Sequence, residues 1–264
     1  MQGSDDIVKV FHYGYRKKQP LILIHGFPYD HVMWKNQIQY LQADHHIVAF
    51  DIRGLGESRT GEYRITMEDL VDDLFEIIEK YDLKDSLLFG LSMGGYISFR
   101  AIERDQSKFR ALVIMDSKTE ADSNNAKLKR AHGIKTIRDE GLDKYLDASM
   151  PLAWAKSTIE NSPKLFQKFL HRAKTFDPAG VSAALFAMLS RTNTTRTLSN
   201  IKIPTLFLVG ESDNLTTPES VKKIYEKVEN STFEIVPNAG HMSPIENPDF
   251  VNKQIGKFLR SIHQ

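Results

Sequence analysis

The chain has 264 residues, of which 41% are hydrophobic and 26% charged, and a net charge of +1 at pH 7. This composition is typical of a globular protein, and the balanced charge favours neither nucleic acid nor a membrane surface as a partner. The absence of cysteine excludes disulfides and thiolate metal sites and fits a reducing compartment. The segment MQGSDDIVKV lacks the basic and apolar regions of a signal peptide, and the apolar runs are of strand length, so we expect a cytoplasmic protein.

The first part of the chain is predicted to alternate between strands and helices. Residues 8–13 alternate weakly in hydropathy and predict an edge strand. The apolar runs at 21–25 and 47–51 show little alternation, which is typical of strands buried on both faces of a parallel sheet. A helix is predicted between them at residues 32–41, and a loop at 53–58 follows the second run.

Thr66 marks the start of the next predicted helix, because Asp69 lies three residues later in a variant of the capping box. The apolar positions of this helix recur with helical spacing and define one face: Leu70, Val71, Leu74, Ile77, Ile78 and Tyr81. Residues 86–91 then predict a further buried strand.

The residues after that strand carry the strongest functional signal. The stretch Gly90-Leu91-Ser92-Met93-Gly94 fits G-x-S-x-G, in which a serine occupies a sharp turn between a strand and a helix. Residues two positions before and after the serine approach it closely, and glycine avoids the clash. The turn places the Ser92 hydroxyl at the N-terminus of the following helix, where unpaired N–H groups can stabilise an oxyanion.

Residues 111–116 form the next predicted strand, after which the pattern changes. Strand-like runs are absent from the following 80 or so residues. Ser162-Pro163 and Asp177-Pro178 each pair a capping residue with proline at the first helical position. Apolar strand runs resume at 204–210 and 232–236, and a helical pattern follows each of them.

Strands that alternate with helices indicate an α/β fold with a mostly parallel sheet flanked by helices. We predict one core domain formed by residues 1–117 and 201–264. A helical cap, residues 118–200, is predicted as an insertion between two strands. Ligands bind beyond the carboxyl ends of the strands in such a sheet, so the residues that follow strand ends are candidates for a functional site.

Three residues at strand ends are candidates for nucleophilic catalysis: Ser92, Asp213 and His241, in this chain order. A serine hydroxyl needs a base to become nucleophilic near neutral pH, and the base needs an acid that orients it. Asp213 is favoured as the acid because it directly follows a strand. Glu211 and Asp116 remain alternatives for this role.

Five motifs at these strand ends resemble those of the α/β-hydrolase superfamily: HGFP (25–28), DIRGLGES (51–58), GLSMGG (90–95), GESD (210–213) and AGHMSPIENP (239–248). Within it, residues 115–130 resemble small carboxylesterases and enol-lactonase-like hydrolases. The resemblance implies an α/β-hydrolase fold with Ser92 as nucleophile, His241 as base and Asp213 as acid. It also implies an oxyanion hole from the backbone N–H groups of Phe27 and Met93, and no metal or organic cofactor.

Other residues of these motifs are expected to have structural roles. His25 is expected to bond a neighbouring loop, Asp51 to organise residues 53–58, and the Phe27–Pro28 bond is a candidate for a cis peptide. The remaining histidines that lie among polar residues predict no metal site and are expected at the surface: His31, His45, His46, His132 and His171. The HGFP motif also resembles epoxide hydrolases and haloalkane dehalogenases, which use an aspartate nucleophile, whereas Ser92 favours acyl chemistry.

Apolar residues of the cap and of the strand-end loops are expected to wall the substrate pocket: Pro28, Met150, Trp154, Phe176, Leu185, Met188 and Met242. No cluster of arginine or lysine is evident near the strand ends, so a simple ester is favoured over a charged lactone. We therefore predict a serine hydrolase that cleaves a small-molecule ester through an acyl-enzyme. Lactone hydrolysis, perhydrolysis and a ligand receptor that retains the triad are the alternatives, and no oligomeric state is predicted.

Overall fold

The computed structural model describes residues 7–61 and 64–262. Its sheet has the strand order β1-β3-β2-β4-β5-β6-β7. β1 pairs with β3 in antiparallel fashion, and all the other pairs in the sheet are parallel. The strands are β1 (Val10–Tyr13), β2 (Pro20–Ile24), β3 (His46–Phe50), β4 (Ser86–Leu91), β5 (Phe109–Met115), β6 (Thr205–Gly210) and β7 (Ser231–Val236).

The burial of the strands follows their hydropathy. Every residue of β3, β4 and β6 is buried, as expected for apolar strands covered on both faces. The edge strand β1 is half-buried throughout, and the other edge strand, β7, is exposed or partly buried except at its last residue. The core of the protein is therefore centred on the middle of the sheet.

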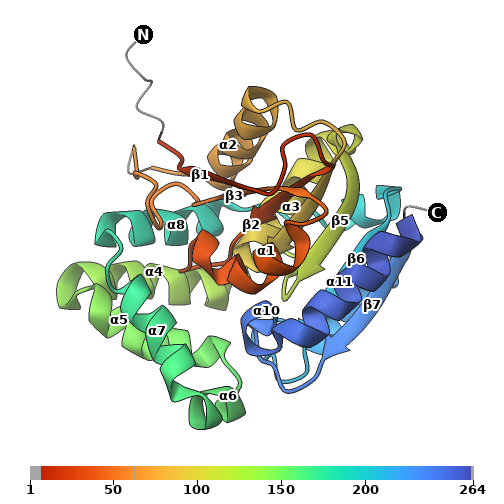
Figure 1. The fold of residues 1–264 in the computed structure, drawn as a ribbon. Coiled ribbons are helices and arrows are strands. Elements are labelled where there is room, and N and C mark those ends of the chain that lie inside the picture. Colours follow the sequence, from red (N-terminus) through yellow and green to blue (C-terminus); the bar gives the residue numbers. More distant parts are fainter. Residues whose placement is uncertain (1–6, 62–63, 263–264) are drawn as a thin grey trace.

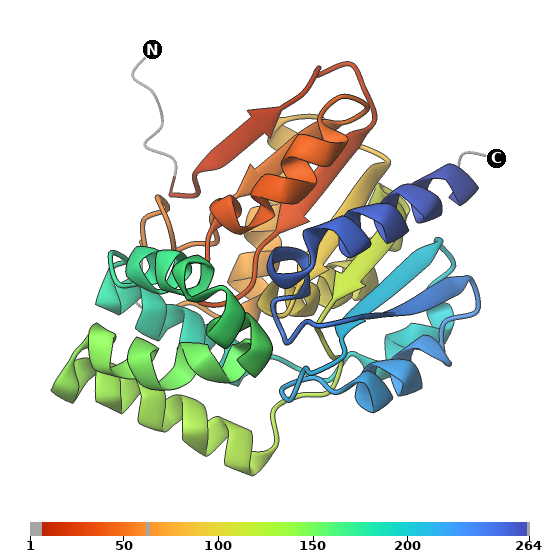
Figure 2. The ribbon, with the colours of Figure 1, turned by 60° about the horizontal axis from the view of Figure 1, so that its bottom comes forward.

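Helices cover both faces of the sheet (Figures 1 and 2). α1 (Lys35–Leu41) and α11 (Pro248–Ile262) contact each other on one face, and α2 (Met67–Lys80) and α3 (Met93–Asp105) contact each other on the other face. α9 (Pro218–Tyr225) packs on β6 and β7, and the short α10 (Ser243–Glu246) precedes α11. The capping box predicted at the start of α2 is confirmed, because Thr66 and Asp69 cap each other's backbone N–H groups.

The segment between β5 and β6 contains helices and no strand, and we call residues 118–200 the helical insertion. Its α-helices gather at the carboxyl-end side of the sheet in Figure 2. They are α4 (Asn124–Glu140), α5 (Leu142–Ser149), α6 (Lys156–Asn161), α7 (Pro163–Ala173) and α8 (Pro178–Ser190). One contact with the core is backbone against backbone: a Cβ added to Gly180 of α8 would lie 1.9 Å from the carbonyl oxygen of Gly54.

Two expectations differ from the structure. The helix predicted at residues 32–41 is divided into a 3₁₀ turn, His31–Trp34, and the α-helix α1. The prediction that the scattered histidines lie at the surface is correct for His132 and His171 but wrong for His31, His45 and His46, which are buried. These three flank or begin strand and helix segments whose packing covers them, and a pattern of local polarity does not report that packing.

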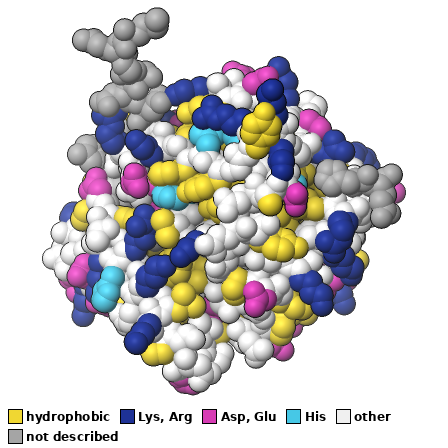
Figure 3. Space-filling view, viewed as in Figure 1, with side chains coloured by type: hydrophobic (Ala, Val, Ile, Leu, Met, Phe, Trp, Pro, Cys, Tyr) yellow, Lys and Arg dark blue, Asp and Glu magenta, His cyan; other side chains and the backbone are white. Residues whose placement is uncertain are grey.

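The surface seen in Figure 3 carries basic and acidic side chains that are interspersed, with hydrophobic ones in small groups, which agrees with the small net charge. Within the described residues, no helix combines the length and the apolar character needed to cross a membrane.

Candidate active site

The turn between β4 and α3 holds Ser92 in an unusual backbone conformation. The φ angle of Ser92 is 50°, in the left-handed region that side chains disfavour. A Cβ on Gly90 would lie 2.5 Å from the carbonyl oxygen of Gly94, and a Cβ on Gly94 would lie 2.2 Å from the carbonyl oxygen of Ile24. The glycines of the G-x-S-x-G motif are therefore required by the close approach of backbone segments around the serine.

The structure brings Ser92, His241 and Asp213 together in one chain of hydrogen bonds. The Nε2 atom of His241 lies 2.7 Å from the Oγ atom of Ser92. The Nδ1 atom of the same imidazole lies 2.7 Å from Oδ2 of Asp213. All three side chains belong to buried residues, and Ser92 and His241 line the same cavity. This arrangement can move a proton from the serine hydroxyl to the imidazole.

The two alternative acids make other contacts. Glu211 is exposed and accepts a hydrogen bond from the Asn238 N–H group at 3.1 Å. Asp116 is fully buried and accepts from the Gly210 N–H group at 2.8 Å, and its other carboxyl oxygen lies 2.5 Å from the Ser243 hydroxyl. Within the described residues, Asp213 is the carboxyl group that is hydrogen-bonded to the imidazole, which favours it over both alternatives.

The ionisation of the site follows from burial and from its charges. Burial alone would lower the pKa of His241, but the charge and the hydrogen bond of Asp213 outweigh it, and the pKa is raised above its usual value. Burial alone would raise the pKa of Asp213, but the charge of His241 and the hydrogen bonds that Asp213 accepts lower it. The site therefore favours an ionised Asp213 beside an imidazole that readily accepts a proton.

Further residues fix the position of these groups. Oδ1 of Asp213 accepts the N–H groups of Leu215 and Thr216 at 2.8 and 2.9 Å. The His241 N–H group donates to the carbonyl of Ala153 in the helical insertion at 2.9 Å. Asp213 is thus held by its own loop, and the backbone of His241 is held by the helical insertion.

Glu246 links the loop that carries His241 to the helical insertion. Its Oε1 atom accepts the N–H groups of Gly240 and Met242 at 3.0 and 3.2 Å, and its Oε2 atom accepts the N–H group of Ala155 at 2.9 Å. Sequence reasoning did not single out Glu246, although it lies within the AGHMSPIENP motif. The sequence shows only that Glu246 lies five residues after His241. That spacing does not indicate a contact, because the turn of α10 brings the Glu246 side chain back to the loop.

A cavity of about 440 Å³ opens in front of Ser92. Four of the seven apolar residues predicted for its wall line it, namely Pro28, Met150, Leu185 and Met188, and Phe27 lines it as well. The prediction is wrong for Trp154, Phe176 and Met242, which are buried and do not line this cavity. Trp154 packs on the rings of Phe166 and Phe169 and donates its indole N–H to the Tyr29 hydroxyl at 2.8 Å.

The cavity also has a basic wall, which we define as Lys118, Lys129 and Arg130. Asp122 is the carboxylate among the described lining residues, and it is paired with Arg130 and with the buried Arg191. No ion pair joins Lys118 or Lys129 to a carboxylate in the described part of the chain. The expectation that no basic cluster lies near the strand ends is therefore wrong. The cations come from the insertion and from its junction with β5, and their approach to the strand ends depends on tertiary packing.

The two residues predicted for the oxyanion hole, Phe27 and Met93, belong to segments that adjoin Ser92. Met93 is the first residue of α3, and the first N–H groups of a helix have no partner inside the helix. A Cβ on Gly26 would lie 3.3 Å from Cβ of Ser92, so residues 26 and 27 pass directly beside the turn. The Phe27–Pro28 peptide bond is cis. The role of Phe27 and Met93 stays a prediction.

His25 has the structural role that was expected. Its Nε2 atom accepts the Ile52 N–H group at 2.8 Å, and its Nδ1 atom lies 2.8 Å from the Gly26 carbonyl. Burial lowers the pKa of His25, which favours the neutral imidazole that these two bonds need. His25 therefore ties the segment that carries Phe27 to the end of β3.

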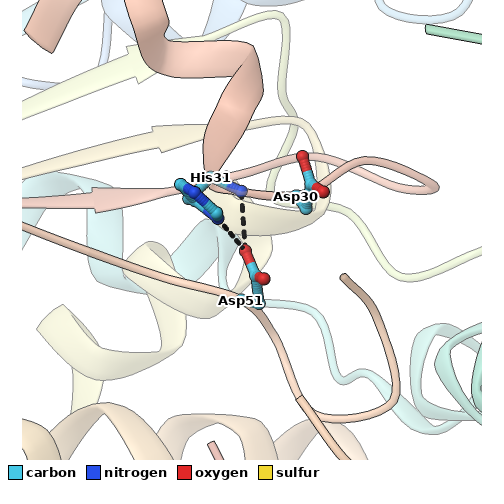
Figure 4. A group of neighbouring side chains, drawn as sticks. All are labelled: Asp30, His31 and Asp51. Carbon is cyan, nitrogen blue, oxygen red and sulfur yellow. Dashed lines mark hydrogen bonds and ion pairs between the residues drawn. The ribbon is translucent and has the colours of Figure 1, made fainter. Parts of the chain in front are cut away.

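Among the described residues, one group has the spacing of a metal-ligand set: Asp30, His31 and Asp51, whose ligand atoms lie within 4.8 Å of one another (Figure 4). Its oxygens already have protein partners. Asp51 Oδ1 accepts the backbone and imidazole N–H groups of His31 at 2.7 and 2.8 Å, and Oδ2 accepts the Glu57 N–H group at 2.8 Å. Asp30 accepts from Val32 and pairs with Arg172. Asp51 thus organises the 53–58 loop, as predicted.

Comparison with known proteins agrees with this fold. Residues 19–248 match the family model described as alpha/beta hydrolase fold. The chain is 25% identical over 250 residues to 3-oxoadipate enol-lactonase 2 of Acinetobacter baylyi, an alignment that covers 94% of this chain and 91% of that one. A solved structure of a thermophilic esterase from Thermogutta terrifontis, with malate bound, superposes with a TM-score of 0.92 at 32% identity, covering 97% of this chain and 94% of that chain.

The enol-lactonase from Burkholderia xenovorans LB400 shares the fold at 21% identity, with a TM-score of 0.89 and 96% coverage of both chains. Because the family model spans most of the chain, and a similar structure is 32% identical over nearly its full length, the protein belongs to the α/β-hydrolase family.

Proposed function

We propose that this protein is a serine hydrolase that cleaves small carboxylic esters through an acyl-enzyme. The observation that carries the proposal is the chain of hydrogen bonds from Ser92 through His241 to Asp213, which borders a cavity of about 440 Å³. Similarity to a thermophilic esterase supports ester hydrolysis, and similarity to enol-lactonases makes a lactone the second candidate substrate.

In the proposed reaction, Ser92 Oγ attacks the ester carbonyl carbon while its proton passes to Nε2 of His241, 2.7 Å away. Asp213 keeps Nδ1 of the imidazole protonated and stabilises the imidazolium. The N–H groups of Phe27 and Met93 stabilise the oxyanion. His241 then gives the proton to the leaving alcohol, and in the second half it takes a proton from the water that attacks the acyl-enzyme.

The basic wall bears on the class of substrate. Three cations and one carboxylate line the cavity beside the serine, so the cavity favours a ligand that carries negative charge. The similar esterase has malate, a dicarboxylic acid, in its structure. We propose that the preferred ester or lactone carries a carboxylate at some distance from the carbonyl that Ser92 attacks.

The test compares initial rates on aryl acetate, aryl butyrate, aryl octanoate, a five-membered lactone and an amide. Ser92→Ala should lower kcat by roughly 10³-fold or more, because the nucleophile is removed. Ser98→Ala is the matched control, because Ser98 is a buried serine of the same helix that donates to the Gly94 carbonyl. Turnover by Ser92→Ala at the wild-type rate would contradict the proposal. Slow stoichiometric acylation without turnover would favour the receptor alternative.

A further inference from the structure

A second cavity of about 440 Å³ lies at the opposite, amino end of the parallel strands. It is bounded by β1, by the first residues of β2 and β3, and by the residues that follow α2. None of the residues that line it lines the cavity at Ser92. We call it the amino-end pocket and define it by His12, Arg16, His46, Lys80, Tyr81 and Lys84.

The amino-end pocket concentrates positive charge. Arg16, Lys18, Lys80 and Lys84 line it, whereas Asp82 is the one carboxylate among its described lining residues. Asp82 is paired with Lys84 at 2.7 Å. Among the lining side chains, cations therefore outnumber carboxylates four to one, in a protein whose net charge is +1. Such an excess attracts an anion with more than one negative charge.

Two imidazoles form the inner part of the pocket. His12 Nδ1 lies 3.1 Å from His46 Nε2, and His46 is only 5% exposed. The other ring nitrogen of His12, Nε2, is buried and has no hydrogen-bond partner within the described residues. In either tautomer of His12, Nε2 can therefore donate or accept a hydrogen bond for which the described residues offer no partner.

The charges around the histidines decide what they can bind. A metal ion held by two imidazoles would face the four surrounding cations, which repel it. An anion would be attracted, and it would also make protonation of the histidines easier. Burial, followed by the charge of Arg16, lowers the pKa of both His12 and His46. A bound anion opposes the effect of Arg16, so binding should be accompanied by proton uptake.

We infer that the amino-end pocket binds a phosphate group carried by a small molecule. A phosphate dianion offers several acceptor oxygens to the Arg16 guanidinium and to the ammonium groups. The volume of the pocket leaves room for an organic part beside the phosphate, and the Tyr81 ring, 4.6 Å from the His12 ring, offers a surface for it. This inference does not depend on the proposed hydrolytic activity.

The experiment is calorimetric titration at pH 7 and low ionic strength, with inorganic phosphate, adenosine 5′-monophosphate and adenosine as the probes. We expect one-to-one binding of phosphate and of the monophosphate but not of adenosine. Titration in two buffers of different ionisation heat gives the net number of protons exchanged. His12→Gln should shift this number toward release, because the proton that the phosphate itself loses is common to both proteins. The double variant Arg16→Gln/Lys80→Gln should weaken phosphate binding by at least tenfold.

The matched control is Lys222→Gln/Lys223→Gln, which removes two exposed cations from α9, away from the pocket. Phosphate affinity in this control should equal that of the wild type. The inference is overturned if phosphate does not bind at millimolar concentration, or if the control loses as much affinity as the pocket variant. Circular dichroism of the same samples provides the check that all variants are folded.

Discussion

Two buried carboxyl groups lie near His241, and they have different partners. Asp213 is hydrogen-bonded to the imidazole, whereas Asp116 is hydrogen-bonded to the Gly210 N–H group and the Ser243 hydroxyl. Burial, followed by the charge of Asp213, raises the pKa of Asp116 well above its usual value. The pKa of Asp213 is instead lowered, so Asp213 is the favoured site of the negative charge beside the His241 imidazole.

This difference predicts that replacing the carboxyl group by an amide lowers kcat strongly at Asp213 and only weakly at Asp116. Asp213→Asn should lower kcat by about 10³- to 10⁴-fold, because the amide removes the charge and disturbs the imidazole tautomer. Asp116→Asn should change kcat by less than about tenfold, because Asp116 is hydrogen-bonded to Gly210 and Ser243 and not to the imidazole. The measurement is kcat on one ester at pH 8, with circular dichroism to compare folding. A loss as large for Asp116→Asn as for Asp213→Asn would contradict the assignment.

The pH dependence of activity provides a second prediction at the residue scale. In the proposed mechanism His241 acts as the base only when it is neutral, and its pKa in the folded protein is raised. The acid limb of kcat/KM should therefore have its midpoint above pH 6.5, the value of an unperturbed histidine. In Asp213→Asn the charge that raises the pKa is lost while burial remains, so the limb of the residual activity should move to lower pH. A wild-type profile that stays flat down to pH 5 would exclude His241 as the base.

At the scale of elements, α8 meets the core through a contact without side chains. The backbones of Gly54 and Gly180 touch, and a Cβ on Gly180 would overlap the Gly54 carbonyl, 1.9 Å away. The Gly54 segment is in turn fixed by Asp51, whose Oδ2 accepts the Glu57 N–H group. Through this contact, one end of α8 packs against the loop that follows β3. The contact leaves no room for a methyl group on residue 180.

Gly180→Ala should consequently destabilise the protein, even though alanine is the better helix former by about 1 kcal/mol. We expect the free energy of unfolding, measured with urea, to fall by about 1–3 kcal/mol because backbone atoms must move apart. Gly133→Ala in α4 is the comparison, since the nearest atom to its added Cβ is a carbon of the Tyr145 ring at 2.7 Å, which can shift more easily than backbone. If Gly180→Ala were as stable as the wild type, α8 could move away from Gly54 without a loss of stability, and the prediction would be wrong.

Most of the elements could be predicted from local pattern. The strand at Ser86–Leu91 has the predicted bounds, and the capping box at Thr66 starts α2 as expected. Local pattern failed where a residue's environment comes from distant segments. His31 lies in a polar stretch, yet it is buried because its ring stacks on Phe11 of β1 at 3.6 Å and bonds Asp51 after β3.

At the scale of the whole molecule, the candidate site divides into a predictable part and an unpredictable part. Ser92, Asp213 and His241 could be found because each follows a strand, and parallel strands bring their carboxyl ends to one edge. The cavity wall could not be found in the same way. Which face of each helix in the insertion turns toward the sheet depends on how those helices pack on one another, so Trp154 was misplaced and the basic wall was missed.

The basic wall makes a prediction about the electrostatic selectivity of the molecule. An aryl hemisuccinate and an aryl butyrate have nearly the same shape but differ by a terminal carboxylate, so the ratio of their kcat/KM values isolates the effect of charge. Lys118→Gln/Lys129→Gln should lower this ratio by about tenfold, as expected if each of the two cations contributes about 0.7 kcal/mol. Lys127→Gln, which removes an exposed cation of α4 that does not line the cavity, should leave the ratio unchanged.

The difference in this ratio between the wild type and the double variant should shrink as salt rises, because screening weakens attraction between exposed charges. A ratio that is the same in the double variant and the wild type would mean that the lysines do not select the substrate, and the proposed preference for a carboxylate would have to be abandoned while ester hydrolysis by Ser92 could still stand.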